Sequence, residues 1–409
     1  MRILFITHYF APDSGAASNR LTQLAEMLHQ RGHEVTVLTT MPHYPTGVIP
    51  PDYRRRFTVI EDRAGLRVIQ VWLWTSTSSK VSRRLISQLS FMMTCAIRGM
   101  FVKRPDVIFI ENQPIFTGLA GWFVSKLKRR PYVLNVSDYW PEYLVVAGVT
   151  KETSRMYRAF KWLTNLTQRD AAGIVTLLDD LLVKIEARIG KVKSGRVIQN
   201  AVNLTRFNPD IDGTAFREKY QLGDVRLITF LGVLGPHIDL ETMLQVAAKI
   251  KRGDVKFVFV GSGAQSEWLK QALTKSELSH CKSIDWIGAE EVPGFWGATD
   301  IHFWALHHNE LDKMRFQAKL YEALATGTPT VIAVDGLMSQ VLDEHQMGIT
   351  VAPYDVDALT QQLEHLLDDP DYYHRISQNA SEYANAHFNI EKAVDAYESM
   401  LKQIADVAF

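Results

Sequence analysis

The chain contains 409 residues, of which 46% are hydrophobic and 22% charged, so it is long enough for two globular domains and is not a disordered or fibrous protein. Its formal net charge is zero, yet residues 1–205 contain 28 Lys and Arg against 15 Asp and Glu, whereas residues 206–409 contain 17 against 30. A basic half suits anionic lipid or a phosphorylated substrate, and because the sequence has no nucleic-acid-binding motif we expect no nucleic-acid partner.

The cysteines and the first residues indicate the compartment. The two cysteines, Cys95 and Cys281, provide neither a disulfide framework nor the spacing of metal ligands, which favours a reducing compartment. The apolar run of residues 1–7 is too short for a signal peptide and leads into a turn. We therefore expect a cytoplasmic protein.

The first forty residues follow a strand–helix–strand pattern. Residues 2–6 predict a buried strand, residues 8–20 a turn-rich loop, residues 21–30 an amphipathic helix that Gly32 ends, and residues 34–39 the next strand. This opening is typical of a doubly wound parallel sheet. Because no G-x-G-x-x-G motif is present, a nicotinamide cofactor is disfavoured.

Residues 80–104 predict a long helix with a broad apolar stripe and a basic border. The stripe consists of Leu85, Leu89, Met92, Met93, Ala96, Ile97, Met100 and Phe101. The border consists of Lys80, Arg83, Arg84, Arg98, Lys103 and Arg104. The helix is too short and too charged to span a bilayer. It could lie in the membrane interface with its basic residues on the headgroups, or it could pack on the sheet with a basic outer face.

Polar residues follow the next two predicted strands, residues 106–110 and 132–136. Glu111 follows the first strand, and Asp138 and Trp140 follow the second. Ligands of open parallel sheets bind beyond the carboxyl ends of the strands. Carboxylates can accept the hydroxyl groups of a sugar and a tryptophan can stack on its ring, so the pattern predicts a sugar site. Alternatively, Asp138 is a capping residue and Trp140 a core residue.

Strands and helices continue to alternate in the second half, which predicts a second doubly wound sheet. The remaining strands are expected at residues 172–177, 195–202, 227–232, 255–260, 283–288, 300–306 and 330–334. Residues 204–224 are expected to be a linker, and residues 358–367 and 373–404 amphipathic helices.

Residues 316–332 predict a short helix, a stop at Gly327 and a buried strand. Lys319 and Glu322 are three residues apart near the helix start, so they share one face. Unpaired N–H groups at a helix start suit a phosphate, to which Lys319 adds a charge, while Glu322 can accept hydroxyl hydrogen bonds from a ribose. An ordinary surface ion pair has the same spacing, so the residues alone leave both interpretations open.

The segment Lys319-Leu-Tyr-Glu-Ala-Leu-Ala-Thr-Gly-Thr-Pro resembles the donor-site helix of the retaining GT-B glycosyltransferases of family 4. Residues 137–142 resemble the Asp-Leu-Trp-Pro-Glu segment of the branch that builds bacterial surface polysaccharides. The resemblance covers nearly the whole chain and implies an α/β fold of two Rossmann-like, doubly wound domains facing a cleft. These would be an N-terminal acceptor-binding domain over residues 1–205, a C-terminal nucleotide-sugar-binding domain over residues 206–385, and a helix over residues 386–409 that crosses back to the N-terminal domain.

The residues and the resemblance together predict the site. The catalytic residues are expected to be Lys319, Asp138 and Glu111. The residues expected at the nucleotide sugar are Gly15, Ala16, Arg20, Gly232, Gly263, Ile287, Lys319, Leu320 and Glu322. In the family the helix start holds the diphosphate, the glutamate holds the ribose, and backbone at the position of Ile287 meets the base.

The chain departs from the family pattern around the diphosphate. Ala16 and Ala201 stand where the family usually has glycine. The loop after Gly232 lacks the usual Arg and Lys and offers only His237 as a cation. We therefore expect Lys319 to carry the diphosphate charge, with Arg20 or another basic residue supplying the second positive charge.

A further departure concerns the transferred sugar. Met314 stands where an acid usually contacts that sugar, so Glu310 or Asp312 is expected to replace it. His307 and His308 lie beside Glu310, but adjacent residues have poor spacing for a tetrahedral metal site. Enzymes of this family need no metal, and we expect none here.

The expected function is that of a retaining, metal-independent glycosyltransferase. It would move a hexose or N-acetylhexosamine from a UDP-sugar, UDP-glucose or a UDP-N-acetylhexosamine, to a lipid-linked or oligosaccharide acceptor in polysaccharide biosynthesis, with no cofactor besides the donor. The basic half and the apolar stripe predict peripheral contact with an anionic membrane at the inner face of the cell membrane. The alternatives are a nucleotide-sugar epimerase of the same architecture and a non-catalytic nucleotide-sugar-binding protein.

Overall fold

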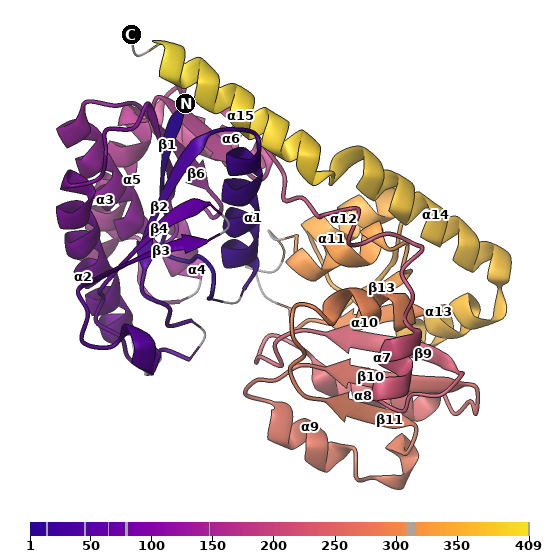
Figure 1. Cartoon of the computed structure of the whole chain (residues 1–409). Helices are drawn as coiled ribbons and strands as arrows, with labels where there is room; N and C mark the ends of the chain where they lie inside the picture. Colours follow the sequence, from indigo (N-terminus) through magenta and orange to yellow (C-terminus); the bar gives the residue numbers. More distant parts are fainter. Residues whose placement is uncertain are drawn as a thin grey trace. The chain divides into compact units, whose positions relative to one another are not determined.

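The computed structural model describes residues 1–407 apart from 14, 45, 64, 78–80, 147, 309–312, 314 and 315. The chain forms two compact units, and Figure 1 shows the elements of each. Unit 1 comprises Met1–Asn200 and Glu391–Phe409, and unit 2 comprises Ala201–Ile390. The sequence analysis placed the corresponding boundaries after residues 205 and 385.

Unit 1 is built on an eight-stranded sheet with the order β3-β4-β2-β1-β5-β6-β7-β8. Its strands are β1 (Arg2–Ile6), β2 (Glu34–Thr40), β3 (Thr58–Arg63), β4 (Leu66–Val71), β5 (Val107–Glu111), β6 (Tyr132–Val136), β7 (Gly173–Thr176) and β8 (Gly195–Val197). All neighbouring strands are parallel except the edge pair of β3 and β4. The strand order reverses between β1 and β5, which makes the sheet doubly wound, as predicted.

Helices cover both faces of this sheet. They are α1 (Ala16–Gln30), α2 (Val81–Met100), α3 (Ile115–Lys128), α4 (Glu142–Val146), α5 (Arg155–Asp170), α6 (Asp179–Ile189) and α15 (Ile390–Val407), with a 3₁₀ turn, η1, at Pro51–Tyr53. In Figure 1, α2, α3 and α5 lie on one side of the sheet and α1 lies on the other. Helix α6 packs into the same buried cluster as α2 and α3, whereas α15 contacts the end of α1. The long helix expected at residues 80–104 is α2.

The last helix, α15, completes unit 1. The hydroxyl group of Tyr397 donates to Asn135 Oδ1 on β6 at 3.0 Å. Arg31, after the end of α1, pairs with Glu398 at 2.9 Å. Met400 is fully buried. A segment that follows unit 2 in the sequence therefore supplies part of the core of unit 1.

Unit 2 is built on a six-stranded, wholly parallel sheet with the order β11-β10-β9-β12-β13-β14. Its strands are β9 (Arg226–Leu231), β10 (Val255–Val260), β11 (Cys281–Ile284), β12 (Ile301–Ala305), β13 (Thr330–Ala333) and β14 (Ile349–Val351). The order reverses between β9 and β12. Unit 2 is therefore a second doubly wound sheet, and the predicted fold class of two Rossmann-like domains is confirmed.

The helices of unit 2 differ from the sequence predictions at the start of the unit, where a linker was expected. They are α7 (Thr214–Lys219), α8 (Leu240–Lys249), α9 (Ser266–Ala272), α10 (Val292–Ala298), α11 (Ala318–Ala325), α12 (Leu337–Glu344), α13 (Val356–Asp368) and α14 (Pro370–His387), with a 3₁₀ turn, η2, at Ser276–Leu278. Residues 204–224 were expected to be a linker, but they contain α7, because Phe216 is buried and its ring packs against Phe295 at 5.7 Å. The strand expected at residues 283–288 is β11, which ends at Ile284.

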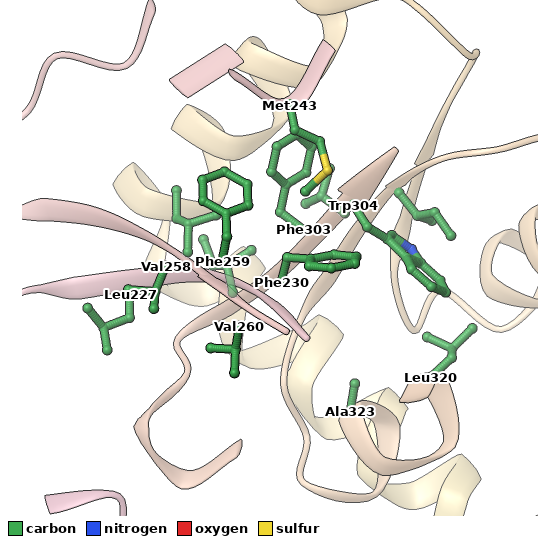
Figure 2. Close-up of a cluster of buried hydrophobic side chains, with 14 of the residues drawn as sticks. Leu227, Phe230, Met243, Val258, Phe259, Val260, Phe303, Trp304, Leu320 and Ala323 are labelled. Atoms are coloured by element: carbon green, nitrogen blue, oxygen red, sulfur yellow. The ribbon is translucent and has the colours of Figure 1, made fainter. Parts of the chain in front are cut away.

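The core of unit 2 fixes the short helix α11 over the sheet. Figure 2 shows Phe230 of β9, Phe259 of β10 and Trp304 of β12 in one apolar cluster with Leu320 and Ala323 of α11. These side chains are buried. Because the apolar face of α11 is held in this core, the polar residues of the helix have fixed positions.

Candidate active site

Lys319 lies at the carboxyl edge of the unit 2 sheet, where the strand order reverses. Its ammonium nitrogen is 3.6 Å from the centroid of the Trp304 ring and 4.1 Å from that of Phe230. Trp304 is near the end of β12 and Phe230 near the end of β9, the two strands that flank the switch point. Aromatic faces attract a cation. The positive charge is therefore held where ligands of doubly wound sheets bind.

The neighbouring buried histidine responds to this charge. Burial lowers the pKa of His302 to about 3, and the charge of Lys319 contributes to the shift. Its Nδ1 lies 3.1 Å from the carbonyl oxygen of Thr229, so Nδ1 carries the proton of the neutral ring. His302 is therefore a neutral core residue, and Lys319 is the cation of this edge.

Glycines allow backbone to approach Lys319. A Cβ atom on Gly232 would lie 3.2 Å from the Lys319 nitrogen. Gly261 follows β10 with φ +142°, and its Cβ would lie 1.9 Å from the Gly232 oxygen. The predicted Gly263 packs similarly, since its Cβ would lie 2.4 Å from the oxygen of Leu234. Any larger residue at these positions would separate the two loops that border the site.

Glu322 lies one turn after Lys319 on α11 and is held by a tryptophan. The indole nitrogen of Trp296 donates to Glu322 Oε2 at 2.9 Å. Trp296 is only 1% exposed, so this donor has a fixed position. Burial raises the pKa of the Glu322 carboxyl group, while the Trp296 hydrogen bond and the positive charge of Arg206 oppose the rise.

The other two residues predicted in unit 2 offer backbone rather than side chains. Leu320 is fully buried and belongs to the core in Figure 2. Ile287 is also buried and lies beyond the end of β11. A contact of either residue with a ligand would therefore be made by main-chain atoms.

In unit 1, Gly15 and Ala16 lie at the start of α1. Gly15 is the N-cap residue with φ +142°, and its Cβ would lie 3.2 Å from the ring of Tyr44. Ala16 is the first residue of the helix. The small residue at position 15 is thus required both by the backbone conformation and by the tyrosine that covers it.

Arg20 of α1 is bonded to three acceptors within unit 1. Its Nη1 donates to Asn200 Oδ1, and its Nη2 donates to Glu111 Oε2 and to Ser137 Oγ, each at 3.0 Å. The predicted contact of Arg20 with a diphosphate would have to compete with these bonds. The role of Arg20 as a diphosphate ligand therefore remains a prediction.

Glu111 is the partner of Arg20 and is 1% exposed. Besides Arg20, Asn135 donates to its Oε2 at 2.7 Å and Ser137 to its Oε1 at 2.8 Å. Burial raises the pKa of Glu111, and the charge of Arg20 opposes this shift. Both oxygens are occupied, which favours a positioning role for Glu111 over direct contact with a substrate.

Asp138 lies beside this cluster. Gln113, which follows β5, donates from its amide to Asp138 Oδ2. The charge of Asp138 also acts on Glu111, so the structure brings the two predicted carboxylates together at the ends of neighbouring strands. Trp140 packs with a small apolar cluster that includes Phe160, which favours the interpretation of Trp140 as a core residue.

Two family models match most of the chain. The "Glycosyl transferase 4-like domain" model matches residues 15–201, and the "Glycosyl transferases group 1" model matches residues 212–383. The chain belongs to the family 4 type of GT-B glycosyltransferases. The predicted family is therefore confirmed.

Individual relatives of this glycosyltransferase are distant. It is 22% identical over 385 residues to the putative colanic acid biosynthesis glycosyl transferase WcaI of Escherichia coli, a match that covers 90% of this chain and 92% of WcaI. Its structure is similar to sucrose-phosphate synthase from Thermosynechococcus elongatus, with a TM-score of 0.77, 18% identity and 99% coverage of both chains. It is also similar to Anabaena HepE in complex with UDP-glucose, with a TM-score of 0.71, 16% identity, and coverage of 98% of this chain and 100% of HepE.

Two residues of the candidate site were not found from the sequence. Trp296 lies on α10 and reaches Glu322 across 26 positions of sequence, and no motif marks it. Arg206 falls in the stretch interpreted as a linker, yet its charge acts on Glu322. The only feature of the sequence that could have indicated Arg206 is that it is a basic residue beside the crossing between the two predicted domains.

Some predicted features of this glycosyltransferase cannot be placed. Glu310, Asp312 and Met314 lie outside the residues that the structure describes. His308 pairs with Asp335 at 3.0 Å, and within the described part of the chain no group of three or more His, Cys, Asp or Glu residues could hold a metal ion. No helix in the same described part combines the length and apolar character needed to cross a membrane.

Proposed function

We propose that the protein is a retaining, metal-independent glycosyltransferase that moves a hexose or N-acetylhexosamine from a UDP-sugar to a lipid-linked saccharide in polysaccharide biosynthesis. The observation that carries the proposal is the position of Lys319. Its charge lies at the switch point of the unit 2 sheet, one residue into α11, where an anionic leaving group would meet both a cation and the helix start.

In this mechanism the donor lies along the carboxyl edge of unit 2. The diphosphate contacts Lys319 and the backbone at Gly232, the ribose hydroxyls donate to Glu322, and the base meets backbone near Ile287. The bond between the anomeric carbon and the leaving phosphate oxygen breaks, and the acceptor oxygen bonds to that carbon on the same face. The acceptor proton passes to the leaving phosphate, so no protein nucleophile is needed. The protein contributes charge stabilisation and orientation.

Two relatives support the choice of donor and pathway. HepE was solved with UDP-glucose, and WcaI is named for colanic acid biosynthesis. A putative UDP-N-acetylglucosamine 2-epimerase from Listeria monocytogenes, with a TM-score of 0.64, has the same fold and motivates the epimerase as the second candidate.

The surface of unit 1 supports a membrane-bound acceptor. On α2, Phe91 and Cys95 face the core, while Met93 is 61% exposed; Phe101, directly after the end of the helix, is 74% exposed. The adjacent helix α3 adds Leu127, which is 50% exposed. Exposed basic residues border this apolar surface: Arg83, Arg84, Lys103 and Arg104. We propose that this surface of α2 and α3 rests on an anionic bilayer at the inner face of the cell membrane.

A two-step experiment tests the proposed function. A thermal-shift screen of nucleotide sugars identifies the base and hexose of the donor. The selected donor is then incubated with lipid-linked saccharides, with and without EDTA, and release of the nucleoside diphosphate and the anomeric configuration of the product are measured. Acceptor-dependent release with retained configuration is expected, and EDTA should have no effect. Interconversion of two nucleotide sugars without net release would indicate the epimerase, and binding without turnover would indicate a binding protein.

A further inference from the structure

Arg206 is held in place on unit 2 by its own backbone turn. Asn203 Oδ1 accepts from the backbone nitrogen of Thr205 at 3.0 Å and from that of Arg206 at 3.2 Å. The Arg206 nitrogen also donates to the Asn203 carbonyl oxygen at 3.0 Å. The guanidinium group stacks 5.4 Å from the ring centroid of the buried Phe207. The side chain therefore leaves the backbone from a fixed point.

The guanidinium group reaches the loop that follows β11. Its Nη2 donates to the carbonyl oxygen of Ala289, two residues after Ile287. The same stretch continues into α10, where Trp296 donates to Glu322. Residues 287–296 thus connect Arg206 to the carboxylate of the donor helix.

The position of Arg206 separates it from Lys319. Lys319 lies between β9 and β12, whereas Arg206 contacts the loop after β11, the edge strand on the far side of β10 and β9. Neighbouring strands are about 4.8 Å apart, so the two positions differ by roughly 12 Å across the sheet edge. A nucleoside diphosphate is long enough to place its phosphates at one position and its nucleoside at the other.

We propose that Arg206 is a nucleoside-binding residue, whose guanidinium group donates to the nucleoside that Glu322 holds. The proposal rests on the proposed function of unit 2 as the nucleotide-sugar site. Arg206 is exposed, and among the described residues its guanidinium group donates to the Ala289 oxygen alone, which leaves further N–H donors for a ligand. A charge-assisted hydrogen bond from this group would add to the hold of Glu322 on the nucleoside.

Arg206 also acts on Glu322 through its charge. The groups around Glu322 are Trp296 of α10, which is uncharged, Lys319 of its own helix, whose ammonium is held by aromatic rings, and Arg206. His302 of β12, behind Trp296, has its pKa lowered to about 3 and stays neutral. Arg206 opposes the rise that burial causes in the pKa of Glu322. Removal of Arg206 should therefore raise that pKa further.

A ligand series tests the proposal by calorimetry with uridine, UMP and UDP. The variants are Arg206→Gln, Arg206→Lys and, as a matched control, Arg375→Gln, which removes another exposed arginine that stacks on an aromatic ring, Tyr372 at 5.1 Å. Arg206→Gln should weaken all three ligands by the same factor, about tenfold, as expected for the loss of one charge-assisted hydrogen bond. Arg206→Lys should lose less affinity for these ligands, and Arg375→Gln should bind them with the affinity of the wild type.

A pH series separates ligand binding from loop packing. As pH falls, the wild type should lose UDP affinity when Glu322 is protonated, and Arg206→Gln should lose it at a higher pH, whereas Arg206→Lys should resemble the wild type. Equal uridine affinity in the wild type and Arg206→Gln would overturn the proposal, and so would a loss confined to UDP, since that pattern indicates a phosphate contact. If the wild type binds no nucleoside diphosphate in a panel of bases, the proposed function fails and the role of Arg206 fails with it.

Discussion

Replacing Glu322 by alanine should weaken donor binding and also destabilise unit 2. Hydrogen bonds to a charged acceptor contribute about 1.5–3 kcal/mol, which corresponds to a roughly 10- to 150-fold loss of affinity. In addition, the buried indole N–H of Trp296, now bonded to Glu322 at 2.9 Å, would have no partner. An unpaired buried donor costs about 1–3 kcal/mol. For a domain of this size we expect the Tm of unit 2 to fall by roughly 2–12 °C.

The isosteric variant separates the two effects. Glu322→Gln keeps an oxygen for Trp296 and removes the charge, so it should retain most of the stability and still lose donor affinity. UDP binding is measured by calorimetry and unfolding by circular dichroism, with Glu364→Ala, at an exposed position of α13, as the control. Wild-type UDP affinity in Glu322→Ala would refute the ribose assignment. Equal Tm values for the Ala and Gln variants would show that the Trp296 bond adds no stability.

Three other outcomes are expected. Lys319→Ala should lower kcat more than Glu322→Ala does, because the charge on the leaving phosphate grows in the transition state; an equal or smaller loss at Lys319 would contradict the role assigned to it. Co-sedimentation of the wild type with liposomes should require anionic lipid and should weaken with salt. Replacing the border residues Arg83, Arg84, Lys103 and Arg104 by Gln should reduce the binding to liposomes by about 1 kcal/mol per charge. A wild type that does not bind anionic vesicles at low salt would favour a soluble acceptor. Hydrogen bonds from Lys402, His33 and Arg31 lower the pKa of Glu398 from 4.5 to about 2, so the docking of α15 should lose stability as pH falls between these two values. In urea unfolding measured over this pH range, Glu398→Gln should make the free energy of unfolding depend less on pH. The same pH dependence in the two proteins would exclude Glu398 as the cause.

The sequence predicted those parts of the fold in which local pattern and tertiary environment agree. The apolar strands β1, β5 and β6 are buried on both faces, and their runs of Ile, Val, Leu and Phe indicate this directly. The edge strand β3 was missed, because its residues 61–63 are charged and its pairing with β4 is visible only in the sheet.

The candidate site was predictable only where one helix carries it. Lys319 and Glu322 belong to the same turn of α11, so their separation along the sequence predicts that they lie on the same face. Trp296 reaches Glu322 only through the packing of α10 against the core, and no sequence pattern encodes that contact. Glu111 was placed correctly at a strand end, but its saturation by Arg20 and Ser137 depends on side chains 91 and 26 positions away.

The chain leaves unit 1 and returns to it, and this has a consequence for how the protein folds during its own translation. Residues 1–200 leave the ribosome first, yet the face of the sheet that α15 covers cannot be closed until residues 391–407 follow. Unit 2 is complete before that moment. At translation rates of about 5–20 residues per second, synthesis of the intervening segment leaves nascent unit 1 open for roughly 10–40 s. During that interval the apolar surface that later receives Tyr397 and Met400 is a natural target for a ribosome-associated chaperone.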